Sequence, residues 1–199
     1  WLGRLISSFP LAIRRLASSS MSKLTAENLV DLLGRSGLID KAQIERVKEE
    51  LRAEHGADLP EGAALAEEFI KRDLITRWQA DKLLEGRYKG FFLNKYKLLS
   101  LLGTGGMSSV FLGENVLMQK RVAIKVLPKH RVEDSSYLER FINEARAAGR
   151  LTHPNIVHTY DIDNDGPNHY IVMEYVPGRN LQQVVKDDGP LSYKRAADY

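Results

Sequence analysis

Two patterns of apolar residues divide the chain. Between residues 21 and 90 the apolar side chains recur at helical spacing, as Leu29, Leu32 and Leu33 do. From residue 91 onwards, short β-branched or leucine-rich runs are typical of strands. We therefore expect a small all-α module over residues 21–90 and a separate α+β domain over residues 91–199.

The helical module repeats its plan after 36 residues. Asp40 with Gln43 has the pattern of an N-cap and its capping partner, and Thr76 with Gln79 repeats it. Two helix-turn-helix hairpins are expected, because one hairpin alone could not bury its apolar stripe. The segment His55–Gly62 should join them.

Helical hairpins of this kind raise the question of DNA binding. Residues 21–90 carry 12 basic and 14 acidic side chains, a net charge of −2. Phosphate contacts need an excess of lysine and arginine, so we expect no nucleic-acid binding. An interaction or regulatory module with a protein partner fits this charge better.

The second domain has the order β-β-β-α-β-β, followed by a loop and two helical starts. Antiparallel strands with one packed helix make an α+β lobe. Its helix should open at Ser136, with Glu139 as the capping partner. The turn before the last strand is expected at Asp163-Asn164-Asp165-Gly166. The predicted strands span residues 96–102, 110–112, 121–127, 156–162 and 170–176.

The remaining features of the sequence limit the cellular location and the kinds of site that the protein can have. The chain contains no cysteine, which excludes a disulfide scaffold and cysteine-ligated zinc. Residues 1–20 form a leader that holds three arginines and no acidic residue, a composition typical of a targeting peptide. Met21 has the sequence context of a natural start of translation. We therefore favour the interpretation that the leader is translated upstream sequence. No apolar run approaches the ~20 residues of a membrane span. We expect a cytoplasmic protein and leave open an anchor beyond the chain.

A glycine-rich turn between two predicted strands is the first sign of chemistry. It runs from Leu102 to Val110 and includes Gly103 and Gly105. Without β-carbons the backbone can approach a polyphosphate and direct amide N–H groups at its oxygens. A plain hairpin explains this turn equally well when it is taken alone. A dinucleotide-binding turn and a Walker loop are excluded, because a strand follows the glycines and no Gly-Lys-Ser/Thr ends the run.

Two charged residues add to this turn. Lys125 ends the apolar run Val122-Ala123-Ile124-Lys125, where its ammonium is well placed for a phosphate oxygen. Glu144 lies in the predicted helix, close enough to form an ion pair with it. The alternatives are a lysine whose stem packs on the sheet with its charge in water, and a solvated helix carboxylate.

Together these features resemble the small lobe of a bacterial eukaryotic-type (Hanks-type) serine/threonine protein kinase. The resemblance covers residues 96–199 and implies a five-stranded antiparallel sheet with one helix. The pieces that carry it are Gly103-Thr104-Gly105-Gly106-Met107-Ser108, Val122-Ala123-Ile124-Lys125, Phe141-Ile142-Asn143-Glu144-Ala145, His153-Pro154-Asn155-Ile156-Val157 and Met173-Glu174-Tyr175-Val176-Pro177-Gly178.

The resemblance assigns roles to individual residues. In such kinases the glycine-rich turn covers the phosphates, and one lysine held by a glutamate binds the α- and β-phosphates. The third glycine of the family's pattern is Ser108 here. The expected nucleotide-binding residues are Leu102, Gly103 and Gly105 in the turn, Val110 and Ala123 against adenine, Lys125 and Glu144 at the phosphates, Met173 behind the adenine, and the backbone of Glu174 and Val176 at its edge.

The resemblance also implies ATP and Mg²⁺ as cofactors and protein hydroxyls as substrates. The catalytic-loop Asp and Asn and the Asp-Phe-Gly motif are not in the sequence, so catalysis and metal binding are expected to need residues beyond Tyr199. Asp161–Gly166 imitates a calcium loop but has Val172 where the bidentate Glu belongs, so no metal site is expected there. The alternative function is a non-catalytic nucleotide-binding or scaffold protein.

Overall fold

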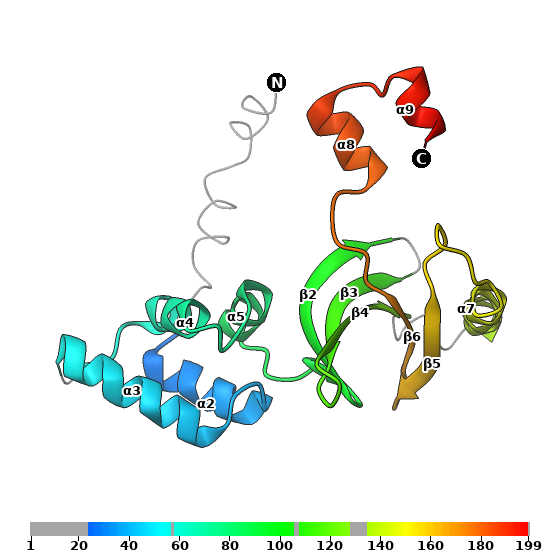
Figure 1. The fold of residues 1–199 in the computed structure, drawn as a ribbon. Coiled ribbons are helices and arrows are strands. Elements are labelled where there is room, and N and C mark those ends of the chain that lie inside the picture. The colour runs from blue at the N-terminus through cyan, green and yellow to red at the C-terminus, as the bar shows by residue number, and fades with distance from the viewer. Residues whose placement is uncertain (1–23, 57, 106–107, 128–134, 199) are drawn as a thin grey trace, which may run out of the picture.

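The computed structural model describes residues 24–56, 58–105, 108–127 and 135–198. The predicted leader lies outside these residues. Within them, no helix combines the length and the apolar character that crossing a membrane requires. The described chain consists of a helical module, a sheet with one helix across it, and two further short helices (Figure 1).

Four helices build the module, as two hairpins. They are α2 (Ala26–Ser36), α3 (Lys41–His55), α4 (Gly62–Lys71) and α5 (Arg77–Leu84). One buried cluster, the module core, unites them, and Leu29, Leu33 and Phe69 are fully buried in it. Two hairpins that share a core are what the repeat predicted.

The predicted caps are present, with one difference between the repeats. Asp40 accepts a hydrogen bond from the Gln43 amide at 2.7 Å, and Thr76 accepts one from the Gln79 amide at 3.2 Å. A full capping box is found at Thr76, where the Gln79 side chain also accepts from the Thr76 amide. Gly86 follows α5 with φ +81°, the left-handed conformation that favours glycine at a helix end.

The described part of the second domain holds a six-stranded sheet in the order β1-β2-β3-β4-β6-β5, with every neighbouring pair antiparallel. The antiparallel sheet is confirmed, and its sixth strand, β1, has only two residues, too few to leave a pattern in the sequence. The strands are β1 (Phe92–Leu93), β2 (Tyr96–Thr104), β3 (Ser109–Asn115), β4 (Lys120–Val126), β5 (Thr159–Asp165) and β6 (Asn168–Glu174).

Several predicted boundaries are wrong. β5 begins three residues later than expected, because Ile156 lies in a turn in which its amide donates to the His153 carbonyl. The strand continues to Asp165, so the turn before β6 is shorter than predicted. Helix α7 (Ser135–Ala148) begins before Ser136, which therefore lies inside its first turn and is not its cap.

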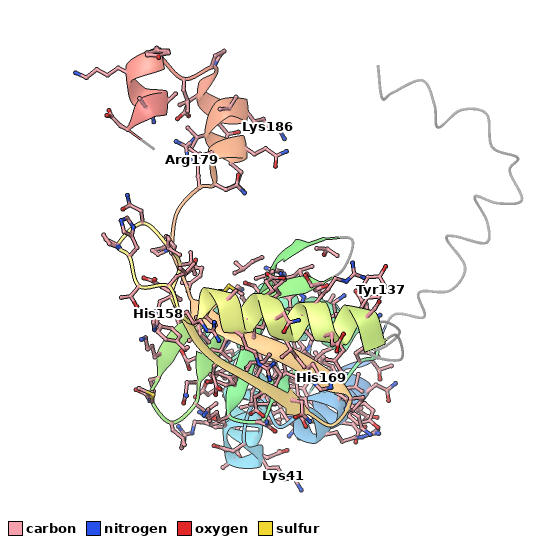
Figure 2. The ribbon with its side chains drawn as sticks, turned by 90° about the vertical axis from the view of Figure 1, so that its right-hand side faces the viewer. Lys41, Tyr137, His158, His169, Arg179 and Lys186 are labelled. Atoms are coloured by element: carbon pink, nitrogen blue, oxygen red, sulfur yellow. The ribbon has the colours of Figure 1, made fainter. Side chains whose placement is uncertain are left out.

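The sheet has two covered faces. Helix α7 lies across one face, and Figure 2 shows it in front of the strands with the helical module behind them. Phe141 and Ala145 of α7 pack there against Leu127 and Ile171. On the other face a second cluster, the sheet core, includes Leu98, Ile124 and Val172 with other apolar residues of β2, β4 and β6.

Trp78 of α5 joins the module to the sheet. It packs against both the module core and the sheet core. Its ring meets Phe91 edge-on at 5.9 Å between centroids and Phe111 at 5.6 Å. Phe91 itself is buried in the module core, although the sequence pattern assigned it to the second domain. The two predicted units therefore pack through shared side chains.

After β6 the chain leaves the sheet. Two short helices, α8 (Leu181–Asp188) and α9 (Tyr193–Ala197), follow an extended segment and lie away from the sheet (Figure 1). Asn180 and Gln183 form a capping box at the start of α8. Both helices agree with the two helical starts that the sequence predicted.

Candidate functional site

The strand register brings four of the predicted nucleotide-binding residues to one face. Val110 pairs with Lys125 across β3 and β4, and Ala123 pairs with Met173 across β4 and β6. Directly paired residues of an antiparallel sheet point to the same side, and so do residues two apart on one strand. Val110, Ala123, Lys125 and Met173 therefore share the face that α7 covers in part.

Lys125 and Glu144 meet across this face. The Lys125 Nζ lies 2.5 Å from Glu144 Oε1. Phe141 and Ala145 anchor α7 on the sheet, and Glu144 lies beside this buried stripe. The lysine side chain is 23% exposed and the glutamate 58%, so the pair is open to solvent on one side. The predicted ion pair is confirmed, and the nucleotide contact remains a prediction.

The described part of the glycine-rich turn lies at the end of the β2–β3 hairpin where Val110 pairs with Lys125. Gly103 pairs with Val110, and the Gly105 amide donates to the Ser108 carbonyl at 2.8 Å. Ser108, in place of the family's third glycine, is buried. Leu102 lies at a register shift in β2 and is exposed. Residues 106 and 107 lie outside the described residues.

The end of β6 has the residues expected at an adenine edge. The Glu174 amide donates to the His158 carbonyl at 2.8 Å, and the Glu174 carboxylate accepts from the His158 amide at 3.2 Å. Of the Glu174 backbone, only the carbonyl can therefore contact a base. Val176 follows the strand and is exposed. The adenine contacts predicted for this pair of residues thus reduce to that carbonyl and the backbone of Val176.

Two hollows lie near this face among the described residues. A hollow of about 330 Å³ borders it at Glu174, lined also by Thr152, His153, Pro154, Ile156 and His158. A second hollow, of about 270 Å³, lies behind the glycine-rich hairpin, against Trp78, Leu101 and Phe111. Gly105 and Lys125 line neither of them.

The donor set suits an anionic ligand better than a metal. A lysine ammonium and a glycine-rich backbone are phosphate donors. The 2.5 Å pair gives the ammonium a fixed direction. Among the described residues, no group of three or more histidine or carboxylate side chains could hold a metal ion. The residues fit the phosphates of ATP and supply no cage for its Mg²⁺.

The sequence analysis missed a second set of residues, on the opposite side of the sheet. Gln79 was recognised only as a capping residue, yet it is 0% exposed and its Nε2 donates to the Leu98 carbonyl at 2.7 Å. Thr76 Oγ1 donates to the Leu99 carbonyl at 2.5 Å. A cap is visible in sequence, but the partner that it contacts 19 to 23 residues away is not.

Comparisons with known proteins bear on residues 96–199, which match the family model described as "Protein kinase domain". Serine/threonine-protein kinase PrkC of Bacillus subtilis is 41% identical over 102 residues, 51% of this chain and 16% of that protein. Serine/threonine-protein kinase PknB of Mycobacterium tuberculosis is 42% identical over 109 residues, 53% of this chain and 17% of that protein. The solved kinase domain of Mycobacterium tuberculosis PknI aligns with a TM-score of 0.44 and 29% identity, covering 51% of this chain and 41% of that one.

Proposed function

The chain belongs to the protein kinase domain family, and from this premise we propose that residues 96–199 bind ATP for phosphoryl transfer to serine or threonine hydroxyls of proteins. The chain spans 16% and 17% of the length of the relatives PrkC and PknB. The transfer itself is therefore proposed for a protein that carries a catalytic loop in addition to these residues.

One observation carries the proposal, the 2.5 Å contact between Lys125 and Glu144 beside the glycine-rich hairpin, whose Val110 pairs with Lys125. An exposed ion pair contributes only about 0–1 kcal/mol to stability. Its value for folding is thus small, and its geometry supports a different use. A carboxylate that fixes the direction of an ammonium prepares it for a second anion, and the phosphate of a nucleotide on this face is such an anion.

Different residues of the chain would contact the phosphates and the adenine ring of ATP. Lys125 would neutralise charge on the α- and β-phosphates while Glu144 keeps the ammonium in place. The backbone of Gly103 and Gly105 would lie over the phosphates, and Val110 and Ala123 would contact the adenine ring. Mg²⁺, when bound with ATP, would neutralise the developing charge on the transferred group. In this proposal its protein ligands are not among the residues described above.

A phosphoryl-transfer assay tests the proposal. The natural protein that contains this chain is incubated with radiolabelled ATP, Mg²⁺ and a general protein substrate, and labelled amino acids are identified after hydrolysis. We expect phosphoserine or phosphothreonine, and a large loss of label in Lys125→Met. Nucleotide binding without any transfer would favour the alternative, a non-catalytic nucleotide-binding or scaffold protein. Label on tyrosine would overturn the proposed specificity.

A further inference from the structure

The capping box of α5 is a link between two parts of the molecule as well as a helix start. Gln79 Oε1 accepts from the Thr76 amide at 2.9 Å, while Gln79 Nε2 donates to the Leu98 carbonyl at 2.7 Å. Thr76 Oγ1 accepts from the Gln79 amide and donates to the Leu99 carbonyl. Each side chain thus makes one hydrogen bond to the start of α5 and a second hydrogen bond to β2.

These bonds reach β2 at a point where its pairing is interrupted. Leu98 pairs with Gly113 and Ser100 with Leu112, so Leu99 is an extra residue in the β2–β3 ladder. An extra residue of this kind bends a strand and turns a backbone group out of the ladder. Here the Leu99 carbonyl accepts a hydrogen bond from the Thr76 hydroxyl. The module therefore bonds β2 at its bend, four residues before Gly103.

The first repeat shows that this contact is an addition to the shared plan. Asp40 stands where Thr76 does and caps α3, but a carboxylate cannot donate a hydrogen bond. Ala42 stands where Trp78 does. Gln43, the counterpart of the fully buried Gln79, is only half-buried. The second repeat has the hydroxyl, the buried amide and the aromatic ring that a contact with the sheet requires.

A hollow lies between α5 and the glycine-rich hairpin, next to the hydrogen bonds from Thr76 and Gln79 to β2. The hollow of about 270 Å³ between α5 and the hairpin is lined by Trp78 on one side and by Leu101, Ser109 and Phe111 on the other. Packing fills only part of the space between α5 and the hairpin, because Trp78 contacts Phe111 while the hollow beside them stays open. The directional hydrogen bonds to β2 add a restraint to that of the Trp78–Phe111 contact.

We propose that Thr76 and Gln79 are positioning residues for the glycine-rich hairpin, through which the helical module sets the geometry of the nucleotide face. The proposal rests on the proposed function for its consequence, the nucleotide affinity, but its structural part does not. The module is then an integral part of the kinase lobe. A change in α5 reaches the phosphate-binding turn through the backbone of β2.

A reciprocal exchange of the two caps tests the structural part without any nucleotide. Thr76→Asp keeps a side chain that caps the helix and removes the hydroxyl donor. Asp40→Thr makes the opposite change in the first repeat, whose cap has no hydrogen bond to the sheet among the described residues. Thr76→Ser keeps the hydroxyl donor. Hydrogen exchange is measured by mass spectrometry on the whole chain. We expect about tenfold faster exchange in β2 and β3 for Thr76→Asp, unchanged exchange in α3 and α7, and wild-type behaviour for Asp40→Thr and Thr76→Ser.

Other outcomes overturn the proposal. Unchanged exchange in β2 and β3 would show that the contact positions nothing, and equally faster exchange in every helix and strand would show a purely structural role. If Thr76→Asp does not fold, Thr76→Gly carries the same test, because it removes the hydroxyl donor without adding a charge and glycine is well tolerated at an N-cap.

The consequence for the nucleotide is measured separately, with a fluorescent ATP analogue on the same variants. We expect Thr76→Asp to raise the Kd about three- to tenfold and Thr76→Ser to restore it. An unchanged Kd in a variant whose hairpin exchanges faster would contradict the coupling. If the wild-type chain binds no analogue while the exchange result holds, the proposed function fails and the structural link stands.

Discussion

The two faces of the sheet carry opposite kinds of contact. On the face under α7, Lys125 and Glu144 form an ion pair whose side chains are 23% and 58% exposed. On the face under α5, Gln79 is 0% exposed and hydrogen-bonded at both ends of its amide. An exposed ion pair contributes about 0–1 kcal/mol to stability, whereas leaving a buried polar group unpaired costs about 1–3 kcal/mol.

This difference teaches that the Lys125 face can be disturbed without disturbing the α5 face. Changes at the Lys125 face should alter ligand binding with little effect on folding. Changes at the α5 face should alter folding or hairpin geometry without removing any ligand contact. Variants at the Lys125 face therefore serve as controls for variants at the α5 face.

The largest effect is expected from Trp78→Ala. The ring joins the module core to the sheet core and is partly buried. We expect the free energy of unfolding to fall by about 2–3 kcal/mol, less than the roughly 3–5 kcal/mol of a fully buried aromatic residue. Urea unfolding measures it, with Trp78→Phe as the control that keeps an aromatic ring. A loss no larger than that of an exposed surface substitution would contradict the joining role.

Next comes Lys125→Met, which keeps the length of the side chain and removes its charge. Hydrogen bonds to charged groups are worth about 1.5–3 kcal/mol, so affinity for an ATP analogue should fall roughly 10- to 100-fold. The free energy of unfolding should change by less than about 1 kcal/mol. Equal affinity in the variant, or a loss of affinity that follows a loss of stability, would contradict the difference between the faces.

A smaller effect is expected from Glu144→Gln, because this residue acts through Lys125. We expect roughly a three- to tenfold loss of nucleotide affinity. In the double variant with Lys125→Met, Glu144→Gln should add nothing further, since the group that it orients is gone. Fluorescence titration of the four proteins gives the coupling. Fully additive losses would mean that Glu144 does not act through the lysine.

The smallest effect concerns Lys97 on the module side of β2, whose Nζ donates to the Leu38 carbonyl at 3.2 Å. Burial lowers the pKa of Lys97 below its usual 10.5. Between the lowered pKa and 10.5 the unfolded chain binds the proton and the folded chain does not, so stability rises with pH there. Relative to Lys97→Met, the wild type should gain stability as pH approaches 10.5. A constant difference would contradict this burial effect.

The sequence predicted the helices and the Lys125–Glu144 ion pair better than the edges of the sheet. Apolar periodicity located the two hairpins, and the spacing of Gly103, Lys125 and Glu144 indicated one face of a kinase lobe. β5 was misplaced because Ile156 and Val157 look like strand residues but are 42% and 44% exposed. β5, an edge strand, carries aspartates at alternate positions. These charges protect the edge from pairing with another strand, and they replace the apolar residues by which a strand is recognised in sequence.

The contact between the module and the sheet could not be predicted. Thr76 and Gln79 have the same sequence signature whether they face solvent or a neighbouring strand. Their partners Leu98 and Leu99 contribute only backbone carbonyls, which leave no trace in the sequence. Asp40 and Gln43, with a similar pattern, make no such contact in the described structure, so only the three-dimensional arrangement distinguishes the two repeats.

Backbone NMR titration of the ¹⁵N-labelled chain with an ATP analogue and Mg²⁺ tests the central claim most directly. We predict saturable shifts for the amides of Gly103, Gly105, Ala123 and Val176, with much smaller shifts in α3. The same spectra of Lys125→Met should show the wild-type fold and weaker binding. Shifts centred on the α5 side of the sheet, or none at any concentration that the wild type tolerates, would contradict nucleotide binding on the Lys125 face.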